Sequence, residues 1–402
     1  MSEQPLRWSR STVAALLHLL SHCRARIAPP MNDVPPALFE LPPPRGSHGQ
    51  FEPARLTQAR VRVGMSKSEL ATAVDVSAAA VGQYEAGVNA PRSEVVERLA
   101  RTLDVRPGFF SVGRPLARID SVNAHFRSLR SARVSDRQKA LSIATLIWEL
   151  TFALERYIKL PEVDLPAVVP GTSPAAAAAA LRAHWGIQEG PVKHLVATAE
   201  SRGIVVATRP LSEVESVDAF SVRIVERPIV ITTPRRSANV FRHRFSIAHE
   251  IGHLLLHAES PEQSAAIERE ADEFAAEFLT PAKAMEAVLP QRLDLATLDR
   301  IGRTWGVSPH SLIRRMTELR RVTDSSARRA FQRLAATNDL AADPTSSYAG
   351  EVPTLLERAA ELAAEHGVTV PAIAEALRLP PAQVRGLLGV ADQRPVLRIV
   401  GE

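Results

Sequence analysis

The sequence contains one cysteine and no long apolar run, and both absences exclude classes of protein. Cys23 stands alone, so a disulfide framework and a site of several thiolates are excluded. A metal ion would have to be held by histidine, aspartate or glutamate. No stretch approaches the roughly 18 apolar residues of a membrane-spanning helix. We therefore expect a cytoplasmic protein that does not contact a membrane.

Lysine is scarce as well. Five of the 49 basic residues are lysine, which leaves 44 arginines, and the net charge is +5. A basic chain favours nucleic acid as a partner, but with 30 prolines the arginine excess fits the codon bias of a GC-rich genome better. The length of 402 residues predicts two or three domains.

Residues 1–50 are expected to be a disordered, proline-rich leader, because PPMNDVPP and LPPPRGSHG carry no sustained period. The short apolar run over 13–20 is not expected to be a signal peptide. His18 interrupts it, and no convincing cleavage site follows.

Residues 51–115 carry the signals of a helix-turn-helix domain. Ser66 and Glu69 form a capping box before a helix over 67–74. Ser77 is the N-cap of a second helix over 78–86. Two short helices joined by such a tight turn are the helix-turn-helix unit.

The stretch VSAAAVGQYEAGVNAPR resembles the lambda-repressor-like (XRE) helix-turn-helix family, with a recognition helix, an aromatic-Glu-x-Gly turn and a proline. The resemblance implies that the second helix enters the major groove of double-stranded DNA. Gln83 can pair with adenine. Ala78 and Ala79 offer few hydrogen bonds, so a degenerate fold kept for dimerisation or protein contact is the alternative. The candidate DNA contacts are Lys67, Ser77, Ala78, Ala79, Gln83 and Arg92.

Residues 245–258, FSIAHEIGHLLLHA, predict a metal-binding helix. His249 and His253 are four apart, so on a helix their imidazoles converge on one point. Glu250 follows the first histidine, as H-E-x-x-H requires. Zinc held there lowers the pKa of its bound water to about 7, and a carboxylate can take that proton. The alternative is a buried structural helix whose two histidines are hydrogen-bonded within the protein and bind no metal.

A third ligand must come from elsewhere in the chain. The next helical segment, IEREADEFAAEFLTP, offers five acids, and spacing alone does not choose between them. These are Glu268, Glu270, Asp272, Glu273 and Glu277.

The pair HEIGHLLLH and EREADEFAAEFLTP looks like the ImmA/IrrE-type metallopeptidases. That resemblance implies Glu270 as the third ligand, with Glu268 and Glu273 as substitutes, and Zn²⁺ or Mn²⁺ as the ion. Glu250 would be the catalytic base. His257 lies about 12 Å along the helix from His249, too far to share the ion, and is expected behind the ligands or at the surface.

Two further expectations concern the substrate. His243, Arg242 and Arg244 are candidates for stabilising the transition state, since no tyrosine lies between residues 158 and 347. Strands are predicted over 203–207, 218–225 and 228–232. An extended substrate would pair with 219–223 as an edge strand.

The predicted fold class is α+β, mostly α. It comprises a five-helix lambda-repressor-like domain, a zincin-like peptidase domain with a small β-sheet, and a helical C-terminal region. The predicted segments are a leader (1–50), a helix-turn-helix domain (51–115), a helical linker (116–170), a peptidase domain (171–290), its helical extension (291–340) and a small helical module (350–395). The linker helix is expected to be a spacer or to form a homodimer.

The leading functional hypothesis is a DNA-binding zinc metalloendopeptidase that cleaves a repressor-type protein to control transcription. One alternative is a transcriptional regulator whose metal domain senses a ligand without proteolysis. Another is an antitoxin that binds a partner toxin.

Overall fold

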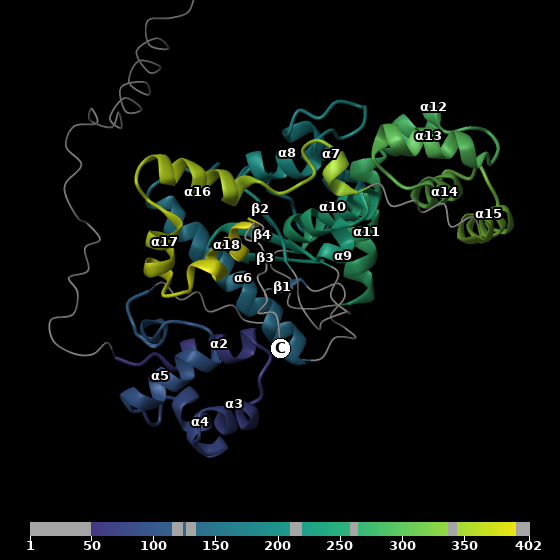
Figure 1. The fold of residues 1–402 in the computed structure, drawn as a ribbon. Helices are drawn as coiled ribbons and strands as arrows, with labels where there is room; N and C mark the ends of the chain where they lie inside the picture. Colours follow the sequence, from purple (N-terminus) through teal and green to yellow (C-terminus); the bar gives the residue numbers. More distant parts are fainter. Residues whose placement is uncertain are drawn as a thin grey trace, which may run out of the picture. The chain divides into compact units, whose positions relative to one another are not determined.

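The computed structural model describes residues 50–114, 124–125, 134–209, 219–257, 264–336 and 344–390 (Figure 1). The contacts divide the chain into two compact units, 1–49 and 50–402, and all described residues belong to the second. The predicted leader and Cys23 lie outside the described residues.

Four α-helices and a 3-10 helix form the predicted helix-turn-helix region. They are α2 (Pro53–Arg62), α3 (Lys67–Ala73), α4 (Ala78–Glu85), α5 (Ser93–Thr102) and η1 (Pro107–Phe110). Both hydrogen bonds of the predicted capping box are present. Ser66 Oγ accepts from Glu69 N, and the carboxylate of Glu69 accepts from Ser66 N. Ser77 Oγ caps α4 by accepting from Ala80 N. The local signals therefore predicted these helix starts correctly.

A four-stranded sheet has the order β1-β3-β4-β2. The strands are β1 (Ala124–His125), β2 (Val205–Thr208), β3 (Ala219–Ile224) and β4 (Arg227–Thr232). β2 and β4 are parallel, whereas β3 pairs antiparallel with both β4 and β1. The three predicted strands are confirmed. The expectation that 219–223 form an edge strand is wrong for the described sheet, because β1 pairs with β3 at Ser221 and Val222.

Helices on one face of the sheet form one of the two apolar cores. The central pair is α10 (Val240–Leu256) and α11 (Ala265–Leu279), and Val206 and Val230 of the sheet join their apolar cluster. The other helices of this part are α7 (Pro174–His184), α8 (Leu195–Ser201), α9 (Pro234–Ser237), α12 (Ala282–Val288), α13 (Leu295–Trp305), α14 (Pro309–Glu318) and α15 (Asp324–Ala336).

The opposite face of the sheet packs against α6 (Val134–Glu155). Because side chains alternate along a strand, Phe220 and Val222 join this second cluster instead of the first. Three helices of the C-terminal region join it too: α16 (Leu355–Glu365), α17 (Val370–Leu377) and α18 (Pro381–Leu388), preceded by η3 (Thr345–Ser347).

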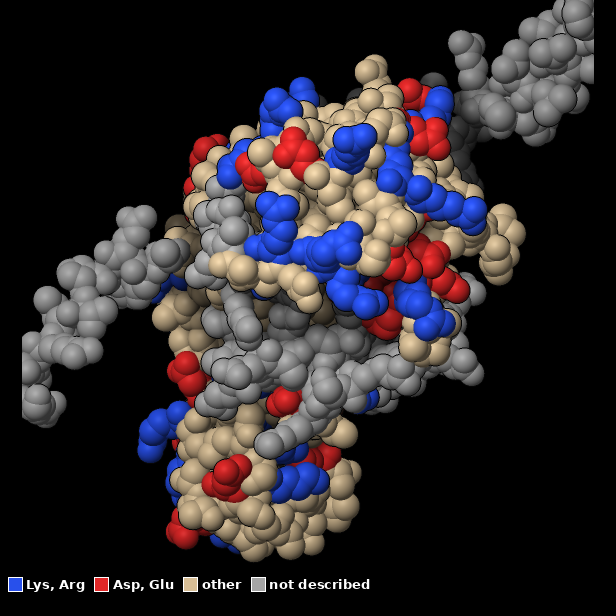
Figure 2. Space-filling view, turned by 90° about the vertical axis from the view of Figure 1, so that its right-hand side faces the viewer, with Lys and Arg blue, Asp and Glu red and all other residues tan. Residues whose placement is uncertain are grey.

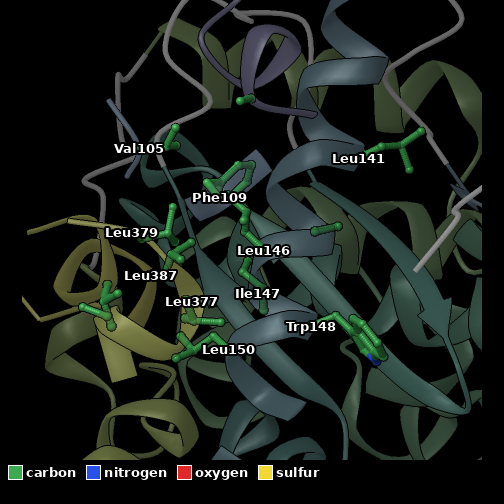
Figure 3. Close-up of a cluster of buried hydrophobic side chains, with 14 of the residues drawn as sticks. Val105, Phe109, Leu141, Leu146, Ile147, Trp148, Leu150, Leu377, Leu379 and Leu387 are labelled. Carbon is green, nitrogen blue, oxygen red and sulfur yellow. The ribbon is translucent and has the colours of Figure 1, made fainter. Parts of the chain in front are cut away.

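The long helix α6, for which the sequence predicts a spacer or a homodimer-forming helix, packs in a core of the described residues. Figure 3 shows its residues Leu146 and Leu150 among side chains of the helix-turn-helix region, such as Phe109, and of the C-terminal helices, such as Leu377. A buried ion pair reinforces this contact, with Arg55 Nη1 2.5 Å from Glu149 Oε1. The helix-turn-helix region is thus anchored to α6.

The predicted class, α+β and mostly α, is confirmed, with a helical N-terminal region, a small sheet and a helical C-terminal part. Among the described residues, no helix is long and apolar enough to cross a membrane.

Candidate metal centre and DNA-reading helix

The helices α10 and α11 carry the predicted metal-binding residues and pack closely together. Side-chain caps start both helices: Asn239 Oδ1 accepts from Arg242 N, and Ser264 Oγ accepts from Ile267 N. Gly252 lies at the contact, where a Cβ atom would be only 2.9 Å from Cδ1 of Phe274. The glycine inside the H-E-x-x-H segment therefore permits the close approach of the two helices.

The two predicted histidine ligands meet in the interior. The side chains of His249 and His253 are fully buried, and their Nε2 atoms are 3.0 Å apart. The helical spacing of four residues thus brings the two ring nitrogens to one point, as expected from the sequence.

Glu268 of α11 completes this group. Its carboxylate oxygens lie 3.6 Å from Nε2 of His249 and 3.6 Å from Nε2 of His253. Together these three residues, which we call the histidine cluster, hold their ligand atoms within 4.8 Å of one another. Tetrahedral zinc with bonds of 2.0–2.1 Å separates its ligand atoms by about 3.3–3.4 Å. The observed spacing fits such an ion.

The hydrogen bond of His249 determines which of its nitrogens can bind a metal. Its Nδ1 lies 2.9 Å from Oδ1 of Asp272. An ionised carboxylate only accepts hydrogen bonds, so Nδ1 carries the proton and Nε2 presents its lone pair to the cluster. The bond also orients the ring, as partners behind metal ligands commonly do.

A longer relay sets the orientation of His253. Glu270 Oε2 accepts from His257 Nε2 at 2.9 Å, and His257 Nδ1 lies 3.1 Å from His253 Nδ1. In the arrangement with one proton on each ring, His257 Nε2 donates to Glu270, its Nδ1 accepts, and His253 Nδ1 donates. The Nε2 of His253 therefore also presents a lone pair to the cluster.

Glu270, the third ligand that the resemblance implies, does not lie with the two histidines. Glu270 belongs to the relay behind His253 and not to the group of converging ligand atoms, where Glu268 stands in its place. The reason is helical geometry: Glu268 and Asp272 are four residues apart and share one face, whereas Glu270 points about 200° away from Glu268. Glu273, the other substitute, lines a separate cavity.

Glu250 is buried beside a residue that the sequence analysis missed. Ser221 Oγ of β3 donates to Glu250 Oε2 at 2.8 Å, and Glu250 is 1% exposed. The hydrogen bond orients the carboxylate of Glu250. Strand pairing places Ser221 there, and no local signal in its sequence identifies that position.

Two of the three candidate transition-state stabilisers have structural contacts instead. Arg244 forms a buried ion pair with Glu351, and its Nε and Nη2 donate to the carbonyls of Gly306 and Val192. His243 Nε2 lies 3.1 Å from the carbonyl of Glu351, and burial lowers the pKa of His243 to about 4. His243, Arg244 and Glu351 form what we call the Arg244 cluster.

Arg242 remains accessible. It is exposed and lines a cavity of about 460 Å³ together with Phe245, Asp272 and Glu273. Asp272 is the residue that contacts His249, so this cavity begins one side chain away from the histidine cluster.

The predicted DNA contacts lie on the surface of the helix-turn-helix region. Ser77, Ala78, Ala79, Gln83 and Arg92 are exposed. Gln83 Oε1 accepts from Asn89 Nδ2 at 2.9 Å, and this bond orients the amide of Gln83.

Lys67, the remaining candidate, is half-exposed and lies 3.3 Å from Glu85 Oε2. On the face drawn in Figure 2, charges of both signs are interspersed over the molecule. The case for DNA binding therefore depends on the helix-turn-helix elements and not on the charge pattern of this face.

Two packed helices that carry a His-His-Glu group and an adjacent glutamate are typical of the class of metal-dependent hydrolases. Comparison with known families agrees: residues 199–317 match the peptidase family model described as the IrrE N-terminal-like domain. Residues 56–110 match the family model described as helix-turn-helix. No curated protein matches the chain. Both segments in one chain support a DNA-binding regulator with a metallopeptidase-like domain.

Proposed function

We propose that this chain is a DNA-binding regulatory metalloendopeptidase of the cytoplasm that cleaves a repressor-type protein. One observation carries the proposal: two nitrogen lone pairs and one carboxylate converge in the histidine cluster, next to the buried Glu250. Each of the three points electron pairs toward a common centre, an arrangement that a bound cation stabilises. We propose His249, His253 and Glu268 as ligands of Zn²⁺, with Mn²⁺ as a weaker candidate.

The residues around the cluster suit peptide hydrolysis. A bound Zn²⁺ would supply an activated water and polarise the substrate carbonyl. Glu250, held by Ser221, accepts the proton of the attacking water and delivers it to the leaving amine. Arg242 is the one predicted stabiliser that stays exposed, and we retain it as the candidate for contacting the developing oxyanion.

The helix-turn-helix region would bring the peptidase to its substrate by binding DNA. The six exposed or half-exposed candidates on α3, α4 and the turn before α5 would contact double-stranded DNA. Binding as a homodimer to two half-sites stays a prediction. We propose that DNA binding places the peptidase beside a repressor at its operator.

The test compares Glu250→Gln with the wild type in the source strain. Gln keeps the size of the side chain and its contact with Ser221 but cannot take a proton. We expect one bound Zn²⁺ and unchanged operator binding in both proteins, with a loss of cleavage of about 10³-fold or more in the variant.

The measurement is N-terminal labelling of the proteome, which reports new protein ends even when the substrate is unidentified. A protein end present only with the wild type identifies the substrate. Identical sets of ends, together with normal regulation by the variant, would refute proteolysis and favour a metal domain that senses a ligand.

A further inference from the structure

The strand β3 lies directly against the candidate catalytic residue. Ser221 in the middle of β3 donates to Glu250, and Arg223 Nη2 donates to the carbonyl of Leu254 on α10 at 3.4 Å. One edge of β3 is fully used, because all six residues pair with β4. A peptide that adds to the sheet beside Glu250 can use only the other edge.

The middle of that other edge is already occupied by the chain itself. β1 pairs antiparallel with β3, with Ala124 opposite Val222 and His125 opposite Ser221. The pairing therefore falls on the residue that contacts Glu250. β1 belongs to the connection between the helix-turn-helix region and α6.

A backbone N–H of β3 can donate to β1 or to a substrate, but not fully to both. A segment tethered in the same chain competes at an effective concentration on the order of millimolar. A strand of two residues is nevertheless short and holds only marginally. Such a competitor lowers peptide binding without abolishing it.

We infer that the outer edge of β3 is a docking edge for extended peptides, and that residues 124–125 of this chain occupy it as an internal competitor. This inference rests on the proposed function, because the docking edge is where a protein substrate of the peptidase would pair. It also places the competitor in the segment that follows the DNA-binding region.

The experiment uses full-length protein with Glu250→Gln, so that turnover plays no part. Ala124→Pro/His125→Pro removes both N–H groups of β1, and one of them faces β3 because the two directions alternate along a strand. Ala124→Gly/His125→Gly is the matched control, since it keeps both N–H groups. The probe is a fluorescent synthetic peptide of residues 119–130, IDSVNAHFRSLR.

We expect the proline variant to bind the probe at least about tenfold more tightly than the glycine variant or the protein with an intact β1. Equal binding in the proline and glycine variants overturns the inference. Should the double proline variant not fold, the two single proline variants replace it. One of them should then bind the probe more tightly than the other, and equal binding again overturns the inference.

Casein cleavage with Glu250 restored separates this inference from the proposed function. Tighter probe binding without any metal-dependent cleavage supports the docking edge and refutes the protease. Cleavage that is equally fast in the proline and glycine variants supports the protease and refutes the internal competitor.

Discussion

The helix α10 carries two buried polar clusters that are built on opposite principles. In the Arg244 cluster, a guanidinium donates to a carboxylate and two carbonyls, so groups of opposite character face one another. In the histidine cluster, two lone pairs and a carboxylate face one another. A cluster of complementary charges is satisfied by its own members, whereas a cluster of converging acceptors suits a cation, as we propose for the histidine cluster.

The largest expected effect would break the Arg244 cluster. Arg244→Ala leaves Glu351 buried without its opposite charge, and the loss of a buried partner costs about 3–5 kcal/mol. We expect the free energy of unfolding, measured with urea, to fall by about that amount. Zn²⁺ bound per folded molecule should not change. Loss of metal with normal stability would contradict the distinction between the two clusters.

The next effect separates the two candidate third ligands. Glu268→Ala removes a donor of the histidine cluster and should weaken Zn²⁺ binding by about 100-fold or more. Glu270→Ala only loosens the relay through His257, and a change behind a ligand costs about 10-fold. Competition with a chelator dye measures both affinities under the same conditions. A larger loss for Glu270→Ala would reinstate the ligand that the family resemblance implied.

The smallest effect concerns pH and the Arg244 cluster. Burial lowers the pKa of His243 to about 4, against about 6.5 in an unfolded chain. Between these values the unfolded state binds a proton that the folded state does not, so stability falls as the pH drops. From pH 7 to pH 5 this group should remove about 2 kcal/mol.

The matched variant is His243→Gln, whose amide does not titrate. Unfolding by urea in the presence of a chelator, at pH 7 and at pH 5, gives the free energies of both proteins. The wild type should lose about 2 kcal/mol more than the variant over this interval. Equal losses in the two proteins would show that His243 does not carry this pH dependence.

Much of the local structure could be predicted because its causes are local. Ser66 and Ser77 start helices through their own side chains, and the four-residue spacing of His249 and His253 brings their rings together on any helix. Short runs rich in valine and isoleucine likewise identified three of the four strands of the described sheet. Helix caps, residue spacing and strand signals do not determine the bounds of the six predicted segments, and those bounds stay a prediction.

The choice among the acids of α11 needed the fold. The resemblance favoured Glu270, but the rotation of α11 against α10 turns Glu268 and Asp272 toward the histidines. Ser221 and Glu351 had no signal at all, because residues far apart in the chain bring them to α10. The same holds for β1, a two-residue strand too short to show a period.

The sequence by itself determined which helices form and which residue types converge along one of them, since capping and helical period act within a few residues. Only the tertiary structure decided which carboxylate faces the histidines, which arginine is neutralised and which strand edge is covered. Those outcomes depend on how separate elements pack, and packing angle and strand register are set by contacts between distant parts of the chain.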